Sequence, residues 1–215
     1  MLVVGAKGFA KEVLEVLHQL DDLHELVFYD DVNSDIPDKL YNRFPVLKSL
    51  DQAKDYFQSV DKRFTIGIGN PVLRKKLLDT FSSLGGEITS TISPKASIGH
   101  FGNIVGDGSN IMTGSVLTND IQIGEGTLIN LNCTVGHDCI IGAFVEMSPG
   151  VHISGNCIVG DFSVLGTNAT VLPKITIGKN VIVGAGSVVT KDLPDNCVAV
   201  GVPAKVIKDL PPLNF

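Results

Sequence analysis

An aliphatic residue recurs at every sixth position across the second half of the chain. From Val105 to Val189, all fifteen of these positions hold an aliphatic residue or methionine. Four positions after each of them stands a second restricted set, mostly small or β-branched, which runs from Ser109 to Leu193. A period of six fits neither an α-helix nor a simple amphipathic strand. It predicts a solenoid in which each hexapeptide forms one short face with its aliphatic residue pointing inward.

Three such faces close one coil, so residues 105–194 are expected to form about five coils. Parallel strands stack about 4.8 Å apart, which makes the expected prism roughly 24 Å long. Glycine, asparagine and aspartate recur where the chain must turn. These residues tolerate a positive φ better than bulkier ones do, so they are suited to the corners of the prism.

The repeat changes at both of its ends. Ile92, Ile98 and Ile104 keep the spacing of six among themselves, and one extra residue then shifts the frame to Val105. We interpret this stretch as a capping coil that is out of phase with the rest. After the repeat, the prolines within residues 194–212 cannot continue a strand ladder and predict its end.

The first ninety residues follow a different pattern, in which apolar strands alternate with amphipathic helices. This half carries most of the charge, whereas the repeat is charge-poor. Alternation of strand and helix is typical of a parallel α/β sheet. We therefore expect two domains, one at residues 1–90 and the other at residues 91–215. Strands are expected at residues 2–4, 26–29 and 64–68, and helices at residues 9–20 and 71–84.

Candidate ligand-binding residues follow each of these strands. The turn Gly5-Ala6-Lys7-Gly8 lets backbone N–H groups approach a phosphate at a helix N-terminus, although it lacks the full GxGxxG pattern. Asp30 and Asp31 follow the second strand, where a carboxylate can bind a ribose hydroxyl or a base edge. Gly69 and Asn70 follow the third. Because ligands bind at the carboxyl ends of parallel strands, the three segments together favour a binding site. A tight turn and a solvated turn remain the alternatives for the first two.

Composition argues against several classes of partner. The net charge is −6, from 17 basic and 23 acidic residues, which disfavours nucleic acid and anionic membranes. No apolar run approaches the roughly 20 residues that span a bilayer, and the first residues do not resemble a signal peptide. We therefore expect a cytoplasmic protein with no membrane partner. Its four cysteines form no CxxC pair and are expected to be reduced and buried.

Both halves together resemble a known family, the bacterial sugar O- and N-acetyltransferases of the NeuD/PglD type. The resemblance implies a Rossmann-like N-terminal domain that binds a nucleotide-sugar, followed by a left-handed parallel β-helix of hexapeptide repeats. It also implies a homotrimer, with acetyl-CoA as co-substrate in the groove between two β-helices, and no metal. Five segments carry the resemblance: residues 5–8, 29–31, 68–70, 135–142 and 201–205, which read GAKG, YDD, IGN, VGHDCIIG and GVPAK.

The resemblance also implies roles for individual residues. His137 matches the catalytic base, Asp138 matches the acidic residue that supports it, and Asn130 matches an asparagine close to that site. The nucleotide-sugar would be held by Lys7, Gly8, Phe9, Asp30, Asp31, Gly69 and Asn70. Acetyl-CoA would contact Glu146, Gly155, Thr167, Ala185, Ala204 and Lys205.

Acetyl transfer needs little catalytic machinery, because a thioester is already reactive. The attacking amine or hydroxyl must lose a proton, and an imidazole suits that role at neutral pH, with a contribution of about 10²–10⁴ in rate. His137 stands off the inward position of its hexapeptide, so packing gives little reason for it. A surface histidine is the alternative there, and Asp138 could simply make the turn. His100 and His152 lack a comparable context, and we expect no chemical role for them.

We predict transfer of acetyl from acetyl-CoA to the amino group of a UDP-, dTDP- or GDP-linked amino-deoxy sugar, for surface glycan synthesis. O-acetylation of a sugar of the sialic acid type would use the same base, although the α/β domain favours a nucleotide-linked acceptor. A non-catalytic nucleotide-binding scaffold is a further alternative. A zinc lyase requires three converging histidines, whereas His137 and His152 lie 15 residues apart and do not stack. The sequence does not distinguish the base, the sugar or the acyl chain.

Overall fold

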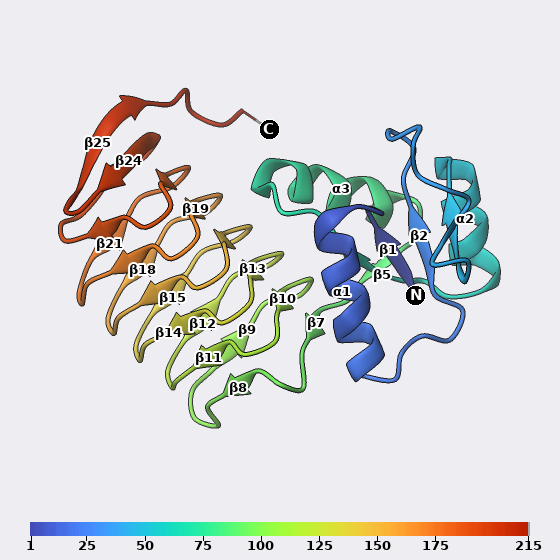
Figure 1. The fold of residues 1–215 in the computed structure, drawn as a ribbon, viewed down its shortest axis with the longest axis horizontal. Coiled ribbons are helices and arrows are strands. Elements are labelled where there is room, and N and C mark those ends of the chain that lie inside the picture. Colours follow the sequence, from blue (N-terminus) through green and yellow to red (C-terminus); the bar gives the residue numbers. More distant parts are fainter. Residues whose placement is uncertain (215) are drawn as a thin grey trace.

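The protein is described by a computed structural model of residues 1–214. An α/β unit packs against the first coils of a three-sided prism, which extends away from it (Figure 1). Among the described residues, no helix is both long enough and apolar enough to cross a membrane.

The α/β unit contains six strands and three helices. They are β1 (Leu2–Val4), α1 (Gly8–Gln19), β2 (Val27–Tyr29), β3 (Lys39–Leu40), β4 (Phe44–Leu47), α2 (Leu50–Ser59), β5 (Arg63–Ile66), α3 (Pro71–Ser83) and β6 (Glu87–Ile88). The strands form one sheet in the order β3-β4-β2-β1-β5-β6, in which only β3 is antiparallel to its neighbour. The predictions of β1, β2, β5, α1 and α3 are confirmed, whereas β3, β4, α2 and β6 were not predicted from the sequence.

Helices cover both faces of this sheet, and the side chains of successive β1 residues pack alternately on one face and the other. Val3 packs with residues of α1, whereas Leu2 and Val4 pack with residues of α2 and α3. A strand that is buried on both faces has no position for a polar side chain, which explains the uninterrupted apolar run of β1. The carboxyl ends of β1, β2 and β5 therefore meet at one edge, between α1 and α3.

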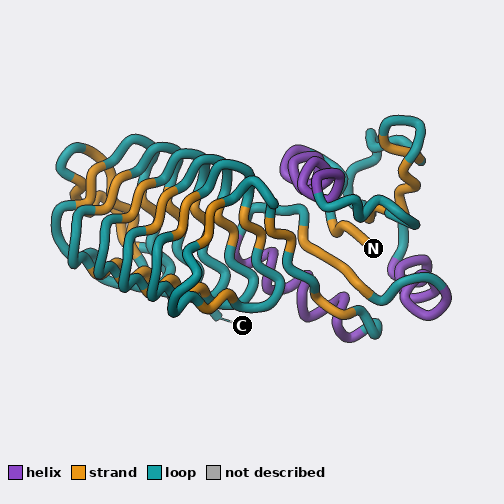
Figure 2. Tube along the Cα trace, turned by 90° about the horizontal axis from the view of Figure 1, so that it is seen from below, coloured by secondary structure: helices purple, strands orange, loops and turns teal. Residues whose placement is uncertain are grey.

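Three parallel sheets form the three faces of the prism, and Figure 2 shows their strands stacked from coil to coil. Face 1 contains β7 (Thr91–Ile92), β10 (Asn110–Ile111), β13 (Leu128–Ile129), β16 (Glu146–Met147), β19 (Val164–Leu165), β22 (Ile182–Val183) and β24 (Cys197–Gly201). Face 2 contains β8 (Ser97–Ile98), β11 (Val116–Leu117), β14 (Thr134–Val135), β17 (His152–Ile153), β20 (Thr170–Val171) and β23 (Val188–Val189). Face 3 contains β9 (Ile104–Val105), β12 (Gln122–Ile123), β15 (Ile140–Ile141), β18 (Ile158–Val159) and β21 (Thr176–Ile177).

The prism is the predicted left-handed β-helix, and its core is the predicted set of aliphatic residues. Every sixth residue from Ile111 to Val189 is buried, and Val105 at the near end is half-buried. The second set, from Ser109 to Leu193, is buried as well. Burial raises the pKa of the Cys133 thiol to about 11, as expected for a cysteine that only fills space.

The interpretation of the first coil as an out-of-phase cap is wrong. Ile92 and Ile98 pair with Ile111 and Leu117, so they point inward and belong to a regular coil. The additional residue lies in the corner after Ile98, and the next inward residue is therefore Val105. Ile104, which the spacing of six placed inside, points outward and is 63% exposed.

Left-handed backbone makes the corners of the prism. From Gly108 to Gly186, every sixth residue has a positive φ, and most of these residues are glycine, asparagine or aspartate. The sequence predicted this use of small polar residues, but it did not predict Phe144 and Phe162, which adopt φ values of 53° and 60°. A bulky residue is uncommon in this conformation, so tertiary contacts must hold these two corners.

Phe144 and Phe162 attach the prism to the α/β unit. Their rings stack with centroids 5.4 Å apart and an interplanar angle of 7°. Phe144 is buried in the same apolar cluster as Leu78 and Phe81 of α3. Gly126, one coil below, must lack a side chain, because a Cβ there would overlap the Phe144 ring. The corner between faces 3 and 1 is thus built to receive the α/β unit.

Arg74 of α3 is the main polar connection between the two units. Its side chain is fully buried and donates hydrogen bonds to the carbonyls of Ile66 and Ile68 at the end of β5. On the prism side it donates to the carbonyl of Gly126 at 2.8 Å and to Asn110 Oδ1 at 2.7 Å. Burial lowers the pKa of Arg74 to about 10, because the charged guanidinium is held out of water.

A second strand hairpin closes the far end of the prism. β24 pairs in parallel with β22, and β25 (Ala204–Asp209) turns back antiparallel to β24. This hairpin covers the last coil. Pro194 does not end the ladder as predicted, because β24 continues face 1 beyond it, whereas the predicted end at residues 201–205 is where the chain turns back. The following tail returns along the prism toward α3, and Asn180 donates to the carbonyl of Pro211.

Replacement of Arg74 by methionine should weaken the whole chain. The variant leaves Asn110 Oδ1 and the carbonyl of Gly126 buried without their donor, which costs about 1–3 kcal/mol for each unpaired group. We expect Arg74→Met to lower the free energy of unfolding by at least about 3 kcal/mol in urea denaturation. Lys75→Met is the control, because Lys75 makes an exposed pair with Asp79, and such pairs contribute little. Equal stability of the two variants would contradict this account of the junction.

Candidate active site

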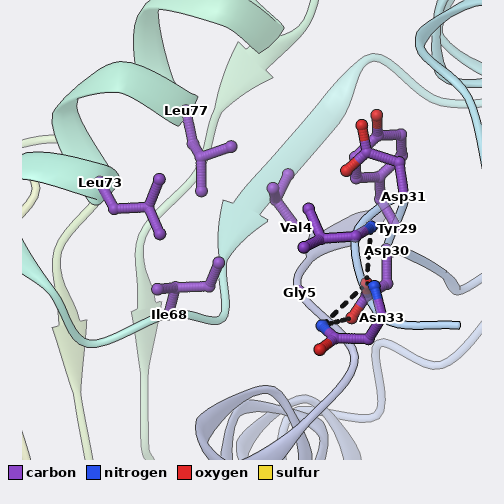
Figure 3. Close-up of a pocket in the computed structure, with 10 residues that line it drawn as sticks. Val4, Gly5, Tyr29, Asp30, Asp31, Asn33, Ile68, Leu73 and Leu77 are labelled. Carbon is purple, nitrogen blue, oxygen red and sulfur yellow. Dashed lines mark hydrogen bonds between the residues drawn. The ribbon is translucent and has the colours of Figure 1, made fainter. Parts of the chain in front are cut away.

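A pocket opens at the carboxyl ends of β1, β2 and β5 (Figure 3). Its volume is about 200 Å³. Val4, Ile68, Leu73 and Leu77 form an apolar wall, in which the last two side chains come from α3. Such a wall can receive the flat face of a base or a sugar, while polar groups at the rim set its orientation.

Asp30 is the fixed polar group at this rim. Its Oδ1 atom accepts a hydrogen bond from the backbone N–H of Asn33 at 2.9 Å, and both of its carboxylate oxygens accept from Asn33 Nδ2 (Figure 3). Asp31 beside it is exposed and stands next to Tyr29. Burial, together with the adjacent Asp31 carboxylate, raises the pKa of Tyr29. Asp30 therefore shapes the loop, and Asp31 is the carboxylate that remains available to a ligand.

The glycine-rich turn forms an adjoining hollow of about 230 Å³ that shares Gly5, Asp30, Asn33 and Ile68 with the pocket. Lys7, Gly8 and Phe9 line it, and Lys7 stands at the N-cap of α1 without a capping side-chain bond. The first turn of α1 contains no acidic residue, so its free N–H groups can bind an anion. Lys7 Nζ lies 2.8 Å from Asp35 and remains half-exposed.

Gly69 and Asn70 lie where β5 passes into α3, but they have different neighbours. Asn70 caps α3, since its side chain accepts from the N–H of Leu73 at 3.0 Å. A Cβ on Gly69, which lines the adjoining hollow, would lie 3.2 Å from Glu146 Oε1, so Glu146 lies directly behind this glycine. Burial raises the pKa of Glu146, and the charge of Arg74 acts in the opposite direction.

His137 lies on a different part of the molecule, at the corner between faces 2 and 3. Its Nδ1 is 2.6 Å from Asp138 Oδ2, and both side chains are more than half exposed. Asp138 adopts a left-handed conformation with φ 58°, so its backbone makes the turn while its side chain bonds the imidazole. The two hypotheses for Asp138, a turn residue and a partner of His137, are therefore compatible.

Gly155 stands one coil beyond His137 in the same corner. A Cβ on Gly155 would lie 2.6 Å from His137 Nε2 and 2.7 Å from Cε1, so the glycine makes room for the ring. Its carbonyl accepts from the N–H of Lys174, but its own N–H has no partner among the described residues. An imidazole and a free N–H donor thus lie side by side. The imidazole can accept a proton, and the N–H can bind the oxygen of a carbonyl under attack.

The structure separates the remaining predicted residues from His137. Asn130, Thr167 and Ala185 all lie at the corner between faces 1 and 2, and Glu146 lies on face 1. Face 1 also carries the α/β unit with its pocket. Ala204 and Lys205 lie in β25 at the far end. Within one chain, the candidate base and the candidate substrate pocket are therefore on opposite sides of the prism.

Some features of the site were not predicted. Asn33 fixes Asp30, and Leu73 and Leu77 supply the apolar wall. The spacing of Asn33 three residues after Asp30 is a recognisable turn signal, whereas the wall depends on how α3 lies over β5. His152 bonds Thr134 on face 2, and residues 1–214 contain no cluster of three side chains suited to a metal.

Family models match both units of the chain. The model of the PglD N-terminal domain matches residues 1–81. The model of the bacterial transferase hexapeptide (six repeats) matches residues 156–191. The chain is also 28% identical over 152 residues to a GDP-perosamine N-acetyltransferase of Escherichia coli O157:H7. That match covers 68% of this chain and 66% of the relative, slightly less than two thirds of its length.

Two solved structures are similar over almost the whole chain. A perosamine N-acetyltransferase from Caulobacter crescentus, a histidine-to-asparagine mutant in complex with CoA and GDP-perosamine, is 32% identical with a TM-score of 0.89. The similarity covers 97% of this chain and 96% of that one. The acetyltransferase domain of PglB from Neisseria gonorrhoeae, in complex with acetyl coenzyme A, is 33% identical with a TM-score of 0.85. Here 96% of this chain and 98% of the other are covered.

The contact between Gly155 and the imidazole can be tested by NMR. In Gly155→Ala the new methyl group occupies the space of the His137 ring, and only that flexible side chain has to move. We expect the imidazole resonances of His137 to shift, while those of His152 stay in place and the melting temperature changes little. Unchanged His137 resonances would show that the ring does not lie over Gly155.

Proposed function

The chain belongs to the family of hexapeptide-repeat sugar acetyltransferases with a PglD N-terminal domain, and from that membership we propose its reaction. It transfers an acetyl group from acetyl-CoA to the amino group of a nucleotide-linked amino-deoxy sugar. The reaction takes place in the cytoplasm, and its product is used for surface glycan synthesis. The observation that carries the proposal is the accessible His137 imidazole, held by Asp138 beside the free N–H of Gly155.

The proposed reaction is a direct acyl transfer. The amine nitrogen attacks the thioester carbonyl, and His137 Nε2 takes the proton as the C–N bond forms, because Nδ1 is engaged with Asp138. The N–H of Gly155 stabilises the oxyanion of the tetrahedral intermediate. When the C–S bond breaks, the CoA thiolate leaves and receives the proton from the imidazolium. Asp138 keeps the ring oriented throughout.

The two ligands approach this base from different elements. The nucleotide binds in the pocket of Asp31, with its phosphates at the N-terminus of α1 beside Lys7 and Gly8. Acetyl-CoA lies along the corner between faces 1 and 2, where Thr167 and Ala185 are exposed one coil apart. Glu146 is the predicted acetyl-CoA contact nearest to the pocket, and we propose that the two ligands meet there.

We propose that a homotrimer completes the site. A ring of three chains can place the corner between faces 2 and 3 of one chain against the corner between faces 1 and 2 of the next. His137 of one chain then reaches Asn130 and the pocket of its neighbour. The separation of these residues within a single chain supports this arrangement, because a base on the opposite side of the prism cannot serve its own pocket.

Loss of the imidazole should abolish most of the activity. We expect thiol release from acetyl-CoA with one of the UDP-, dTDP- and GDP-linked 4-amino sugars, and a kcat at least about a hundredfold lower for His137→Ala. His18→Ala, which removes an exposed histidine at the end of α1, is the control. Near-normal turnover by His137→Ala would remove this residue from the mechanism. A preference for the hydroxyl of a sugar of the sialic acid type would overturn the assignment of the acceptor.

A site shared by neighbouring chains predicts complementation between two inactive variants. His137→Ala retains the pocket, and Asp30→Ala, which releases the loop at its rim, retains the base. Co-expression should form mixed trimers in which about a quarter of the sites combine both intact halves. We therefore expect about that fraction of wild-type activity from the mixture. Activity no higher than the mean of the two separate variants would place the whole site within one chain.

A further inference from the structure

Glu12 of α1 has an unusual environment for a carboxylate. The side chain is half-buried, and its Oε2 atom is enclosed without a hydrogen-bond partner among the described residues. Tyr29 has the only other such buried side-chain oxygen in residues 1–214, and Tyr29 lines the nucleotide pocket. Desolvation raises the pKa of Glu12, so the fold holds this group at a cost.

The position of Glu12 follows from the face of α1 that contacts the prism. Phe9 and Val16, at three positions before and four after, pack with Met112, Leu128 and Leu131. Residues spaced in this way lie on one side of a helix, so Glu12 points toward the prism as well. Farther along the same face, Gln19 bonds Thr113 and Ser93. Polar groups at this seam are thus normally paired, and Glu12 is the exception.

This seam leads to the proposed reaction centre. Gly8, at the phosphate-binding end of α1, lies one turn before Glu12. Leu131, which packs against this face of α1, directly follows Asn130 in the corner between faces 1 and 2. A ligand with its phosphates at Gly8 and its sugar extending toward that corner therefore passes the Glu12 side chain.

We propose that Glu12 is a specificity-determining residue whose carboxylate binds a ring hydroxyl of the acceptor sugar, next to the amine. This inference rests on the function proposed above. The sugar then supplies the donor that the free protein does not provide, and a hydrogen bond to a carboxylate is stronger than one between neutral groups. The position of the hydroxyl fixes the rotation of the sugar, and with it the direction of the nitrogen toward His137 of the neighbouring chain.

A hydroxyl suits this site better than the reacting nitrogen does. A carboxylate in contact with the nitrogen would stabilise its ammonium form and oppose the loss of the proton that attack requires. A hydroxyl stays neutral during the reaction and needs only an acceptor. Glu12 therefore binds beside the reacting atom and leaves the proton to His137.

Steady-state kinetics of Glu12→Gln test this assignment with the nucleotide-linked amino sugar that the wild type acetylates fastest. We expect the KM for that sugar to rise at least about tenfold, as for one lost hydrogen bond to a charged group. The affinity for the nucleoside diphosphate alone should not change, because its contacts lie elsewhere. The melting temperature should stay the same or rise, since the variant removes a half-buried charge whose Oε2 atom has no hydrogen-bond partner among the described residues. Glu15→Gln is the control on the exposed face of the same helix.

A substrate analogue without that hydroxyl gives a second measurement. The wild type should lose at least about tenfold in kcat/KM with the analogue, whereas Glu12→Gln should lose little more. An unchanged KM for Glu12→Gln, or a lower melting temperature with weaker nucleotide binding, would overturn the role of Glu12 and leave the proposed function intact. A wild-type protein that acetylates none of the nucleotide-linked amino sugars would overturn both.

Discussion

Left-handed backbone conformation at every sixth residue of the prism is the constraint on which the rest of the structure depends. Each of these residues turns the chain by one corner, so residues 18 positions apart stand above one another in columns. The three columns have different tasks. One carries Phe144 and Phe162 and receives the α/β unit, another carries His137 over Gly155, and the third carries Asn130. The contacts with the α/β unit and the proposed catalytic residues therefore both lie on corner side chains, which do not belong to the apolar core.

The junction at Arg74 turns two independent architectures into one body. A buried guanidinium without a carboxylate in direct contact is expensive, and the partial compensation comes from Glu146 across the seam. In return, Arg74 ties the loop after β5 to Gly126, the glycine that makes room for the Phe144 ring. The pocket at the ends of β1, β2 and β5 thus keeps a fixed height relative to the coils. In the homotrimer that we propose, a neighbouring chain presents His137 at a matching height.

Much of this fold could be predicted from the sequence, because a period of six specifies both the core and the corners. The prediction failed where the period itself was broken. The additional residue after Ile98 preserves inward packing, and a count of six wrongly placed Ile104 inside. The site was predictable only in part. The family resemblance pointed to His137, and the end of the second strand pointed to Asp31. No sequence pattern reveals which face carries the α/β unit, since all three faces have the same repeat. Glu12 was not singled out because a glutamate on a helix is ordinarily a solvated residue.

The pairing of each coil with the next has a consequence for how such chains can change in length. The contacts between the α/β unit and face 1 involve β7, β10, β13 and β16, and Phe162 adds a contact at the corner before β19. Deletion of one complete coil from the outer part, beyond β19, would bring the ends of two identical cross-sections together and leave the inner part undisturbed. A length change of one residue must instead be absorbed at a corner, as the additional residue after Ile98 is, because within a strand it would turn the later aliphatic residues out toward water. Evolution can therefore change the length of the prism in steps of one complete coil of 18 residues.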